Sequence, residues 1–274
     1  MKNMKFSVAM CVYKGDKAEF FDEALASVYN QTRRPDEVVL TVDGPVPDSI
    51  EEVIKKYVDQ EGLTVCRLEK NMGHGVARRT GLSHCTCDYV AIADADDINV
   101  PTRFERQMAL FETNPQLDAV SSGCYHFVNT IDEVLYEEFL PETDVEIKKF
   151  LKRRCPLCQA STMFRKSKVE EAGGYMDWYH AEDYYLWIRM YLCGAVFQNT
   201  KESLLYVRSN PDYVNRRGGW KYFKSLARLF GYMYKHNVIG LGDYVFNVTS
   251  RFVAQVLLPT SLRGWLRKIV DKQK

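Results

Sequence analysis

Along the first 100 residues, compact apolar runs alternate with segments whose apolar residues recur every three or four positions. The runs predict buried strands at residues 5–13, 36–43, 63–68 and 89–93. The spacing between them predicts helices at residues 19–30, 48–58 and 73–83. Asp48 is expected to cap the second of these helices. Because strands that alternate with helices build βαβ units, we expect an α/β fold with a mostly parallel central sheet flanked by helices.

The same patterns continue to about residue 215. Helices are expected at residues 102–112 and 143–151, and strands at residues 117–127 and 159–164. Gly173 and Gly174 then interrupt the chain before an aromatic cluster. A further helix is expected to begin near Glu182, because acidic residues favour helix N-termini.

The pattern changes in residues 216–274, which predict a basic helical extension. One helical stripe is expected to hold Trp220, Phe223, Ala227 and Phe230. Residues 244–258 are strongly apolar but fall short of the ~20 residues that span a bilayer. Residues 261–270 place apolar side chains, Trp265 among them, on one helical face and basic side chains elsewhere. Such helices lie in the membrane interface; the alternative is that they pack back on the body.

The net charge of +1 hides an asymmetry between this tail and the rest of the chain. Residues 216–274 contain 12 Lys and Arg against 2 Asp and Glu, which gives +10. The remaining residues contain 25 against 34, which gives −9. A basic tail on an acidic body indicates a polyanionic partner. Because no nucleic-acid recognition motif is present, we expect an anionic membrane surface and no nucleic acid.

Composition indicates a globular protein in a reducing setting. Hydrophobic residues make up 46% and charged residues 27% of the 274 positions, and the 8 Cys do not suggest a disulfide scaffold in a chain of this length. Cys155 and Cys158 have CxxC spacing, but no second pair at zinc spacing accompanies them, so we expect structural thiols. No secretory leader precedes the first strand, and a cytoplasmic location is expected.

Three carboxylates follow the apolar run at residues 89–93. Asp94, Asp96 and Asp97 are expected at the carboxyl end of a buried strand, which is the edge where open α/β sheets bind ligands. Clustered carboxylates are costly to desolvate unless a cation joins them, and oxygen ligands suit Mg²⁺ or Mn²⁺. The alternative is an acidic turn that caps the helix after Pro101.

The glycines at residues 73–81 do not form a dinucleotide-binding fingerprint. The position that would need the third Gly of GxGxxG is Arg78, and the segment follows the third strand, not the first. Gly73 and Gly75 instead suit a tight turn into a helix whose amino end faces an anion. Arg78 lies one turn into this helix and could reach the same anion; the alternative is a solvated helix face.

A second candidate group lies near residue 180. Glu182 and Asp183 stand beside Trp178 and Tyr179, just after the Gly–Gly interruption. Aromatic faces suit the C–H surface of a sugar ring, so Trp178 and Tyr179 are candidate acceptor-binding residues. The alternative is an ordinary aromatic core cluster.

Taken together and in this order, these segments are highly specific, and the chain resembles the inverting family 2 glycosyltransferases of the GT-A fold, the nucleotide-diphospho-sugar transferase fold. The resemblance covers about residues 5–210. The matching segments are Ser7-Val-Ala-Met-Cys-Val-Tyr13, Asn30-Gln31-Thr32, Pro35-Asp36-Glu37-Val38, Asp43-Gly44, Gly75-Val-Ala-Arg78, Asp94-Ala-Asp96-Asp97 and Glu182-Asp183. Residues 12–45 further resemble amylovoran-type bacterial exopolysaccharide transferases.

The resemblance implies roles for the matching positions. For the donor, Asp43 would accept the imide N–H of uracil, Val12 and Tyr13 would line the base, and Arg78 would lie near the nucleotide. Asp94 would hold the ribose, and Asp96 would bind the Mn²⁺ or Mg²⁺ that bridges the diphosphate.

For the reaction, Asp183 would be the general base, with Glu182 beside it. The resemblance also implies a domain of residues 1–215, with a nucleotide-binding half (1–100) and an acceptor-binding half (101–215), followed by the tail.

The resulting hypothesis is a UDP-sugar-dependent transferase that acts on a glycan acceptor, lipid-linked, at the cytoplasmic membrane face in bacterial surface polysaccharide synthesis. A departing diphosphate needs a cation, and the attacking hydroxyl needs a base on the opposite face of the sugar. UDP-galactose, UDP-glucose and the N-acetylhexosamine donors stay open. The alternatives are a sugar nucleotidyltransferase, which would need a Gly-rich basic loop after the first strand, and a non-catalytic nucleotide- or sugar-binding module.

Overall fold

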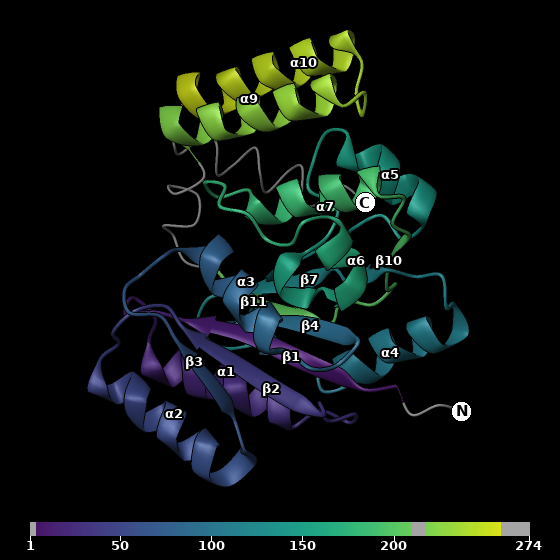
Figure 1. Cartoon of the computed structure of the whole chain (residues 1–274). Helices are drawn as coiled ribbons and strands as arrows, with labels where there is room; N and C mark the ends of the chain where they lie inside the picture. The colour runs from purple at the N-terminus through teal and green to yellow at the C-terminus, as the bar shows by residue number, and fades with distance from the viewer. Residues whose placement is uncertain (1–3, 210–217, 259–274) are drawn as a thin grey trace.

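The computed structural model describes residues 4–209 and 218–258, and a seven-stranded sheet lies at its centre (Figure 1). The strand order across this sheet is β10 (Phe197–Asn199), β6 (Ala119–Ser121), β9 (Met163–Arg165), β4 (Tyr89–Asp94), β1 (Phe6–Val12), β2 (Glu37–Val42) and β3 (Thr64–Arg67). Only the two pairings made by β9 are antiparallel. The mostly parallel sheet and its four N-terminal strands are therefore confirmed.

Helices cover both faces of this sheet, because its strands carry apolar side chains on both. One face packs on three helices: α1 (Ala18–Tyr29), α2 (Asp48–Glu61) and α4 (Arg103–Thr113). Met10 of β1 points to that layer, whereas its neighbour Ala9 points to the opposite one. The opposite layer includes α3 (His74–His84), α5 (Asp144–Leu151), α6 (Lys166–Glu171) and α7 (Glu182–Leu192).

A second sheet of four strands lies beside the first, in the order β5 (Ile98–Asn99), β11 (Leu205–Arg208), β7 (Cys124–Phe127) and β8 (Val134–Glu138). The prediction of one strand at residues 117–127 is therefore wrong, because β6 and β7 belong to different sheets. The chain changes sheet at Gly123, where a Cβ atom would lie 2.5 Å from the carbonyl oxygen of Glu138 and 2.6 Å from Ser203 Oγ. Only glycine allows this close approach.

Two other expectations about local structure need correction. The predicted strand at residues 159–164 is a 3₁₀ turn (Gln159–Ser161) followed by the short strand β9. Asp48 does not cap α2, because Pro47 holds the N-cap position and Asp48 is already the first helical residue. The extended backbone of Pro47 is well suited to this position, since proline fixes φ before the first turn.

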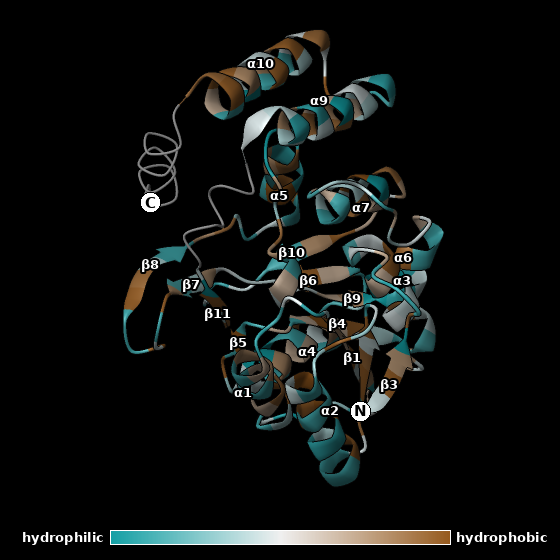
Figure 2. Cartoon of the chain, turned by 90° about the vertical axis from the view of Figure 1, so that its left-hand side faces the viewer, coloured by the Kyte–Doolittle hydropathy of each residue, from teal (hydrophilic) through white to brown (hydrophobic). Residues whose placement is uncertain are grey.

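The C-terminal segment forms a helical pair at the end of the molecule opposite α1 and α2 (Figure 2). It consists of α9 (Gly219–Lys235), α10 (Leu241–Phe252) and a π-helical turn (Val253–Leu257). Ring contacts join the start of α9 to the end of α10 and the end of α9 to the start of α10, so the two run antiparallel. The α9 face toward the core holds Leu226, Leu229, Phe230 and Met233.

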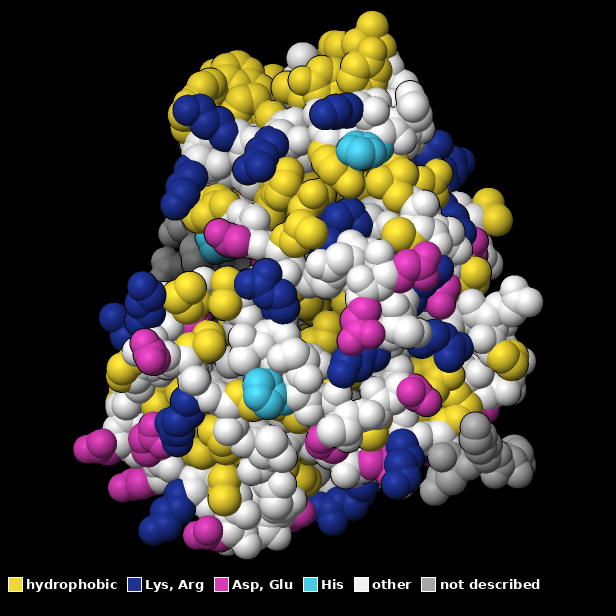
Figure 3. Space-filling view, in the orientation of Figure 1, with side chains coloured by type: hydrophobic (Ala, Val, Ile, Leu, Met, Phe, Trp, Pro, Cys, Tyr) yellow, Lys and Arg dark blue, Asp and Glu magenta, His cyan; other side chains and the backbone are white. Residues whose placement is uncertain are grey.

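The expected stripe on α9 is thus rotated, because Trp220 of that stripe is 52% exposed and only Phe230 is in the core. Exposed apolar side chains also cover the outer face of α10 and the turn after it: Leu241, Val245, Phe246, Val253 and Leu257. Figure 3 shows apolar side chains gathered at this end of the molecule. Within residues 4–209 and 218–258, no helix has the length and apolar character to span a membrane. The helix expected at residues 261–270 lies outside the described residues.

Candidate active site

Neighbouring strands of the large sheet bring the candidate residues to one edge. Cys11 of β1 lies opposite Asp94 of β4, and β2 pairs with β1 in parallel up to its last residue. Tyr13, Asp43 and Asp94 therefore lie at the carboxyl ends of three adjacent parallel strands. This is the edge at which open α/β sheets bind ligands, as the sequence predicts.

The three carboxylates after β4 differ in exposure. Asp96 is exposed, Asp94 is partly exposed and Asp97 is buried. Burial raises the pKa of Asp97 well above its ordinary value, and the charges of Asp96 and Asp94 raise it further. One oxygen of Asp97 accepts the backbone N–H of Arg208 at 3.0 Å. Asp97 thus fixes the loop, whereas Asp94 is open to solvent in part and Asp96 to a greater extent.

Arg208 of β11 fastens this acidic loop to the small sheet. Its Nε donates to the carbonyl oxygen of Asp96 at 3.2 Å, and its Nη2 pairs with Glu23 of α1 at 2.5 Å. The guanidinium lies 3.8 Å from the ring centre of Phe20 and 4.6 Å from that of Phe127. The sequence contains no motif that marks Arg208, since these partners come from three distant segments: α1, the acidic loop and β7.

Arg103 supports the same loop from the protein interior. No sequence motif marks this residue either. Its side chain is fully buried and donates to the carbonyl oxygen of Ile92 at 2.7 Å and to the side chain of Asn99. Burial lowers the pKa of Arg103 to about 9. A buried arginine in the first turn of a helix has the same sequence context as a solvated one, so no local pattern could have found it.

Arg78 joins the two acidic motifs across the site. Its Nη2 lies 3.1 Å from Asp94 Oδ1, and its Nη1 lies 2.7 Å from Glu182 Oε1. Burial alone would lower the pKa of Arg78, but the two carboxylates raise it above its ordinary value. The solvated alternative for Arg78 is therefore wrong. Residues that are 88 positions apart in the sequence, Asp94 and Glu182, meet on one guanidinium.

Asp43 organises the glycine-containing turn before α3. Its two carboxylate oxygens accept the backbone N–H groups of Met72 at 2.6 Å and Gly73 at 3.0 Å. Gly73 has φ +85°, a left-handed conformation that glycine adopts without strain. These two hydrogen bonds tie the amino end of α3 to the carboxyl end of β2, and a helix amino end can bind an anion.

Tyr13 and Asp16 follow β1 at this edge. The backbone N–H of Tyr13 donates to Asp16 Oδ2 at 2.9 Å. Burial raises the pKa of Asp16 from 3.8 to about 7, and the charges of Asp96 and Asp94 add to the shift. The side chain of Val12 is buried in the core, so only its backbone is open to a bound base. Asp16 is a further acidic group that the sequence analysis did not single out.

Asp183 lies in the first turn of α7, next to Glu182. Its Oδ1 accepts the backbone N–H of Tyr184 at 2.7 Å, and the thiol of Cys155 lies 3.9 Å from its Oδ2. Glu182 is held by Arg78, whereas Asp183 is half-buried beside the 155–158 segment. The two adjacent acids therefore have different surroundings, one in a salt bridge and one beside a thiol.

The two candidate aromatic residues also differ. Trp178 is buried between α7 and α9, where its Nε1 donates to the carbonyl oxygen of Ser225 at 3.3 Å. Tyr179 is 39% exposed and lies under the ammonium group of Lys221, 4.0 Å from the ring centre. Tyr179 is thus the more accessible of the two to a ligand.

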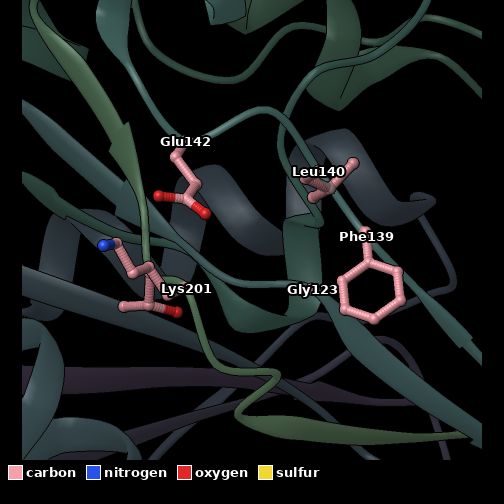
Figure 4. A pocket seen from close by; sticks show the side chains of 6 residues that line it. Gly123, Phe139, Leu140, Glu142 and Lys201 are labelled. Carbon is pink, nitrogen blue, oxygen red and sulfur yellow. The ribbon is translucent and has the colours of Figure 1, made fainter. Parts of the chain in front are cut away.

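A cavity of about 240 Å³ lies elsewhere, between the two sheets' connecting segments, and is lined by Gly123, Phe139, Leu140, Glu142, Thr200 and Lys201. Figure 4 shows Glu142 and Lys201 on one side of it and Phe139 and Leu140 on the other. None of the candidate site residues lines this cavity, so the site at the sheet edge is a separate place.

The acidic loop suits a divalent cation. Asp94 and Asp96 offer only oxygen atoms, the donors that Mg²⁺ and Mn²⁺ prefer. Burial raises the pKa values of Asp97 and Asp16, and the charges of Asp96 and Asp94 raise them further, so negative charge gathers at this loop. A bound cation would compensate that charge, so the residues present fit the group.

Comparison with known proteins agrees with this geometry. The family "Glycosyl transferase family 2" matches residues 7–173. The amylovoran biosynthesis glycosyltransferase AmsE of Erwinia amylovora is 36% identical over 82% of this chain and 84% of its own length. The UDP-Gal:alpha-D-GlcNAc-diphosphoundecaprenol beta-1,3-galactosyltransferase of Escherichia coli is 36% identical over 98% of this chain and 97% of its own length.

Solved structures share the fold at low sequence identity. S. aureus TarS 1-349 in complex with UDP-GlcNAc superposes with a TM-score of 0.68 at 17% identity, over 92% of this chain and 74% of that chain. The mannosyltransferase PcManGT from Pyrobaculum calidifontis, in complex with GDP-Man and Mn²⁺, gives 0.63 at 17% identity, over 98% and 76%. Both are complexes with a nucleotide sugar, and the GT-A fold expected from the sequence is confirmed.

Proposed function

The chain belongs to glycosyl transferase family 2, and we propose that it moves a hexose or N-acetylhexosamine from a UDP-sugar to a hydroxyl of a lipid-linked glycan in bacterial surface polysaccharide synthesis. The observation that carries this proposal is the ion-pair chain from Asp94 through Arg78 to Glu182. It links the edge where a nucleotide would bind to the helix that bears the proposed base.

The donor nucleotide would lie across the ends of β1, β2 and β4. Tyr13 and the backbone of Val12 would line the base, and Asp43 would accept the uracil imide N–H with a lone pair that the Met72 and Gly73 amides leave available. Asp94 would hold the ribose. Arg78 and the amino end of α3 would add positive charge near the diphosphate.

Asp96, with Asp94 beside it, would hold Mn²⁺ or Mg²⁺. When bound, such an ion supplies positive charge that stabilises the departing diphosphate. The Mn²⁺ in the Pyrobaculum calidifontis mannosyltransferase complex supports this choice of cation. Asp97 and Arg208 would keep the loop in place while the leaving group departs, because Asp97 accepts the backbone N–H of Arg208 and Arg208 Nε donates to the carbonyl oxygen of Asp96.

Asp183 is the proposed general base. Its carboxylate would take the proton of the acceptor hydroxyl as the oxygen attacks the anomeric carbon opposite the leaving diphosphate, which inverts the configuration. Glu182 would act indirectly, because its salt bridge fixes Arg78 and the first turn of α7. Tyr179, exposed near this helix, would contact the acceptor sugar, with Trp178 as its buried support.

The pair α9–α10 is the proposed membrane-facing surface. Exposed apolar residues of α10 lie beside basic residues such as Arg153, which stacks on Phe246 at 4.9 Å. Apolar area together with positive charge suits an anionic lipid surface. The Escherichia coli relative, whose name includes a diphosphoundecaprenol substrate, supports a lipid-linked acceptor. Such an acceptor would be presented at that surface.

The test is UDP release from a panel of nucleotide sugars, with and without Mn²⁺, and with a bacterial lipid extract as the acceptor source. UDP-galactose is the first donor to try, because the name of the Escherichia coli relative includes it. We expect Mn²⁺-dependent release from one UDP-sugar, lost in Asp96→Asn and in Asp183→Asn. Full activity of Asp183→Asn would overturn the assignment of the base, and release without any acceptor would indicate hydrolysis instead of transfer.

Membrane contact is tested separately by co-sedimentation with anionic and neutral phospholipid vesicles. We expect binding to anionic vesicles only, reduced in Phe246→Ser and at high salt. A matched control is Val145→Ser, because Val145 is equally apolar and 77% exposed but lies on α5. Equal loss in both variants would contradict the assignment of the surface to α10.

A further inference from the structure

Four potential metal ligands converge outside the proposed active site, at the small sheet. In the antiparallel pair β7–β8, Cys124 lies directly opposite Glu138. His126 follows Cys124 by two residues, so its side chain is on the same face of the strand. One ligand atom from each of these three residues lies within 4.8 Å of the other two.

The fourth candidate, Cys158, comes from a different segment. Its Sγ lies 3.6 Å from Cys124 Sγ. The backbone of Cys158 is fixed on the large sheet, because Ser121 Oγ accepts its N–H at 3.1 Å and donates to its carbonyl oxygen at 3.0 Å. Cys158 belongs to the CxxC segment of the sequence, but its sulfur partner is Cys124 and not Cys155.

The distances match a tetrahedral site. Ligand bonds of zinc imply roughly 3.7 Å between two bound sulfurs and about 3.3 Å between a bound nitrogen and a bound oxygen. The two sulfurs are 3.6 Å apart, and His126 Nε2 lies 3.1 Å from Glu138 Oε2. A sulfur separation of 3.6 Å is far longer than the ~2.05 Å of a disulfide.

The surroundings of His126 are those of a metal ligand. The ring is 1% exposed, stacks on Tyr136 at 4.3 Å, and uses its other nitrogen, Nδ1, for a hydrogen bond with Ser209 Oγ at 3.0 Å. Metal-bound histidines almost always make such an outer hydrogen bond, because it fixes the ring and its tautomer. Cys124 is also 1% exposed, so these two ligand residues are removed from water, whereas Glu138 and Cys158 are partly exposed.

We propose that Cys124, His126, Glu138 and Cys158 bind one Zn²⁺ ion. Two sulfurs, one imidazole and one carboxylate form a four-ligand set of the kind found in zinc sites, whereas Mg²⁺ and Mn²⁺ prefer the all-oxygen set of Asp94 and Asp96. With four protein ligands the site is closed, so the ion is structural.

The Zn²⁺ would join the β7–β8 hairpin to the segment 155–158. Within that segment Cys155 approaches Asp183. The zinc proposal does not depend on the role of Asp183, because metal binding is measured without any sugar transfer.

The test uses the full chain, purified with reductant, stripped with a chelator, then mixed with ZnCl₂ and passed over a desalting column. We expect one zinc per chain by mass spectrometry of the metal, and none in Cys124→Ser or Cys158→Ser. Cys155→Ser is the matched control, because it changes the other cysteine of the same CxxC segment, and it should retain one zinc. CoCl₂ should give a sulfur-to-cobalt charge-transfer band in wild type and not in Cys124→Ser.

Variants that could unfold are checked by circular dichroism, and Ser209→Ala adds a milder change. Loss of the outer hydrogen bond should weaken zinc binding about 10- to 100-fold in competition with a chromophoric chelator, with the fold intact. Folded wild type that retains no zinc would overturn the proposal, as would equal zinc in wild type and Cys158→Ser. A Cys124–Cys158 disulfide that persists in reductant would also overturn it.

Discussion

The two halves of the domain are built differently. In residues 4–97, four strands of 4 to 7 residues pair in parallel and alternate with three helices. In residues 101–209, six strands of 3 to 5 residues are divided between two sheets, and four of their pairings are antiparallel. The first half follows from local sequence pattern, whereas the second depends on contacts between distant segments.

This difference extends to the chemistry. The first half supplies a row of side chains at one sheet edge, each placed by the end of its own strand. The second half supplies Glu182 and Asp183, which reach that edge only through Arg78 and the packing of α7. The side chains proposed to bind the donor should therefore come from the first half, with Arg103 and Arg208 holding their loop, whereas turnover should also require Asp183.

The largest expected effect separates donor binding from turnover. Asp183→Asn should lower turnover about 10³-fold, because general bases contribute roughly 10²- to 10⁴-fold, while UDP affinity measured by calorimetry stays unchanged. Asp48→Asn is the control, since Asp48 is also an acid in the first turn of a helix but is exposed on α2. Loss of UDP binding in Asp183→Asn would show that the two halves are not separable in this way.

The next effect concerns Arg78, whose two ion pairs join the two halves. Arg78→Met leaves Asp94 and Glu182 without their cation, and breaking a buried pair destabilises by roughly 3–5 kcal/mol. Arg67→Met is the control, because the Arg67–Glu51 pair has the same 2.7 Å contact but is half-exposed, and surface pairs contribute about 1 kcal/mol or less. Urea unfolding measures the free energy of unfolding of both variants. Equal losses in the two variants would refute the distinction between the buried and the half-exposed ion pair.

A third effect is a pH dependence that belongs to the first half. Because the pKa of Asp16 rises from 3.8 to about 7 on folding, the folded protein binds more protons than the unfolded chain between these values. Its contribution to stability is therefore greatest at low pH and falls as pH rises toward 7. In metal-free buffer, Asp16→Asn should be more stable than wild type at pH 8 and equal to it near pH 3.

Glu51 supplies the control of opposite sign. Its hydrogen bond with Arg67 lowers its pKa, so its contribution to stability is lost as pH falls. In the same thermal denaturation series, Glu51→Gln should therefore be less stable than wild type near pH 7 and should approach it in acid. If the stability difference between wild type and Asp16→Asn does not change with pH, the prediction for Asp16 is wrong.

The smallest effect tests whether local pattern operates in the second half as well. Thr143 and Glu146 form a reciprocal capping box at the start of α5, and Thr143→Ala should cost about 1 kcal/mol. Thr113→Ala is the control, because the Thr113 hydroxyl donates only to the carbonyl oxygens of Ala109 and Leu110 in its own helix. It should lower the free energy of unfolding by a few tenths of that amount. Equal effects would mean that the box adds nothing to α5.

Much of the fold and part of the site could thus be predicted from sequence. Asp43 and Asp94 could be identified because each ends a long apolar run, which places it at the end of a strand. Arg103 and Arg208 were missed, because burial of an arginine is decided by segments that fold onto it from elsewhere. The hairpin β7–β8 was missed for a related reason.

That hairpin shows what local pattern leaves out. β7 follows Gly123, where the chain changes sheet, and β8 is partly exposed and lacks a long apolar run. The expectation that Cys155 and Cys158 lack further zinc-type partners was based on spacing along the chain. Antiparallel pairing brings Cys124 and Glu138 face to face and places them beside Cys158, which spacing alone does not reveal.

Arg208 has a consequence for communication within the molecule. Its backbone N–H binds the acidic loop, and its strand β11 pairs with β7, which carries Cys124 and His126. A shift of the loop on donor binding would therefore displace β7, and amide hydrogens of β7 would exchange at a different rate although no donor atom reaches them. Thermodynamic reciprocity then requires that zinc and nucleotide change each other's affinity by the same factor.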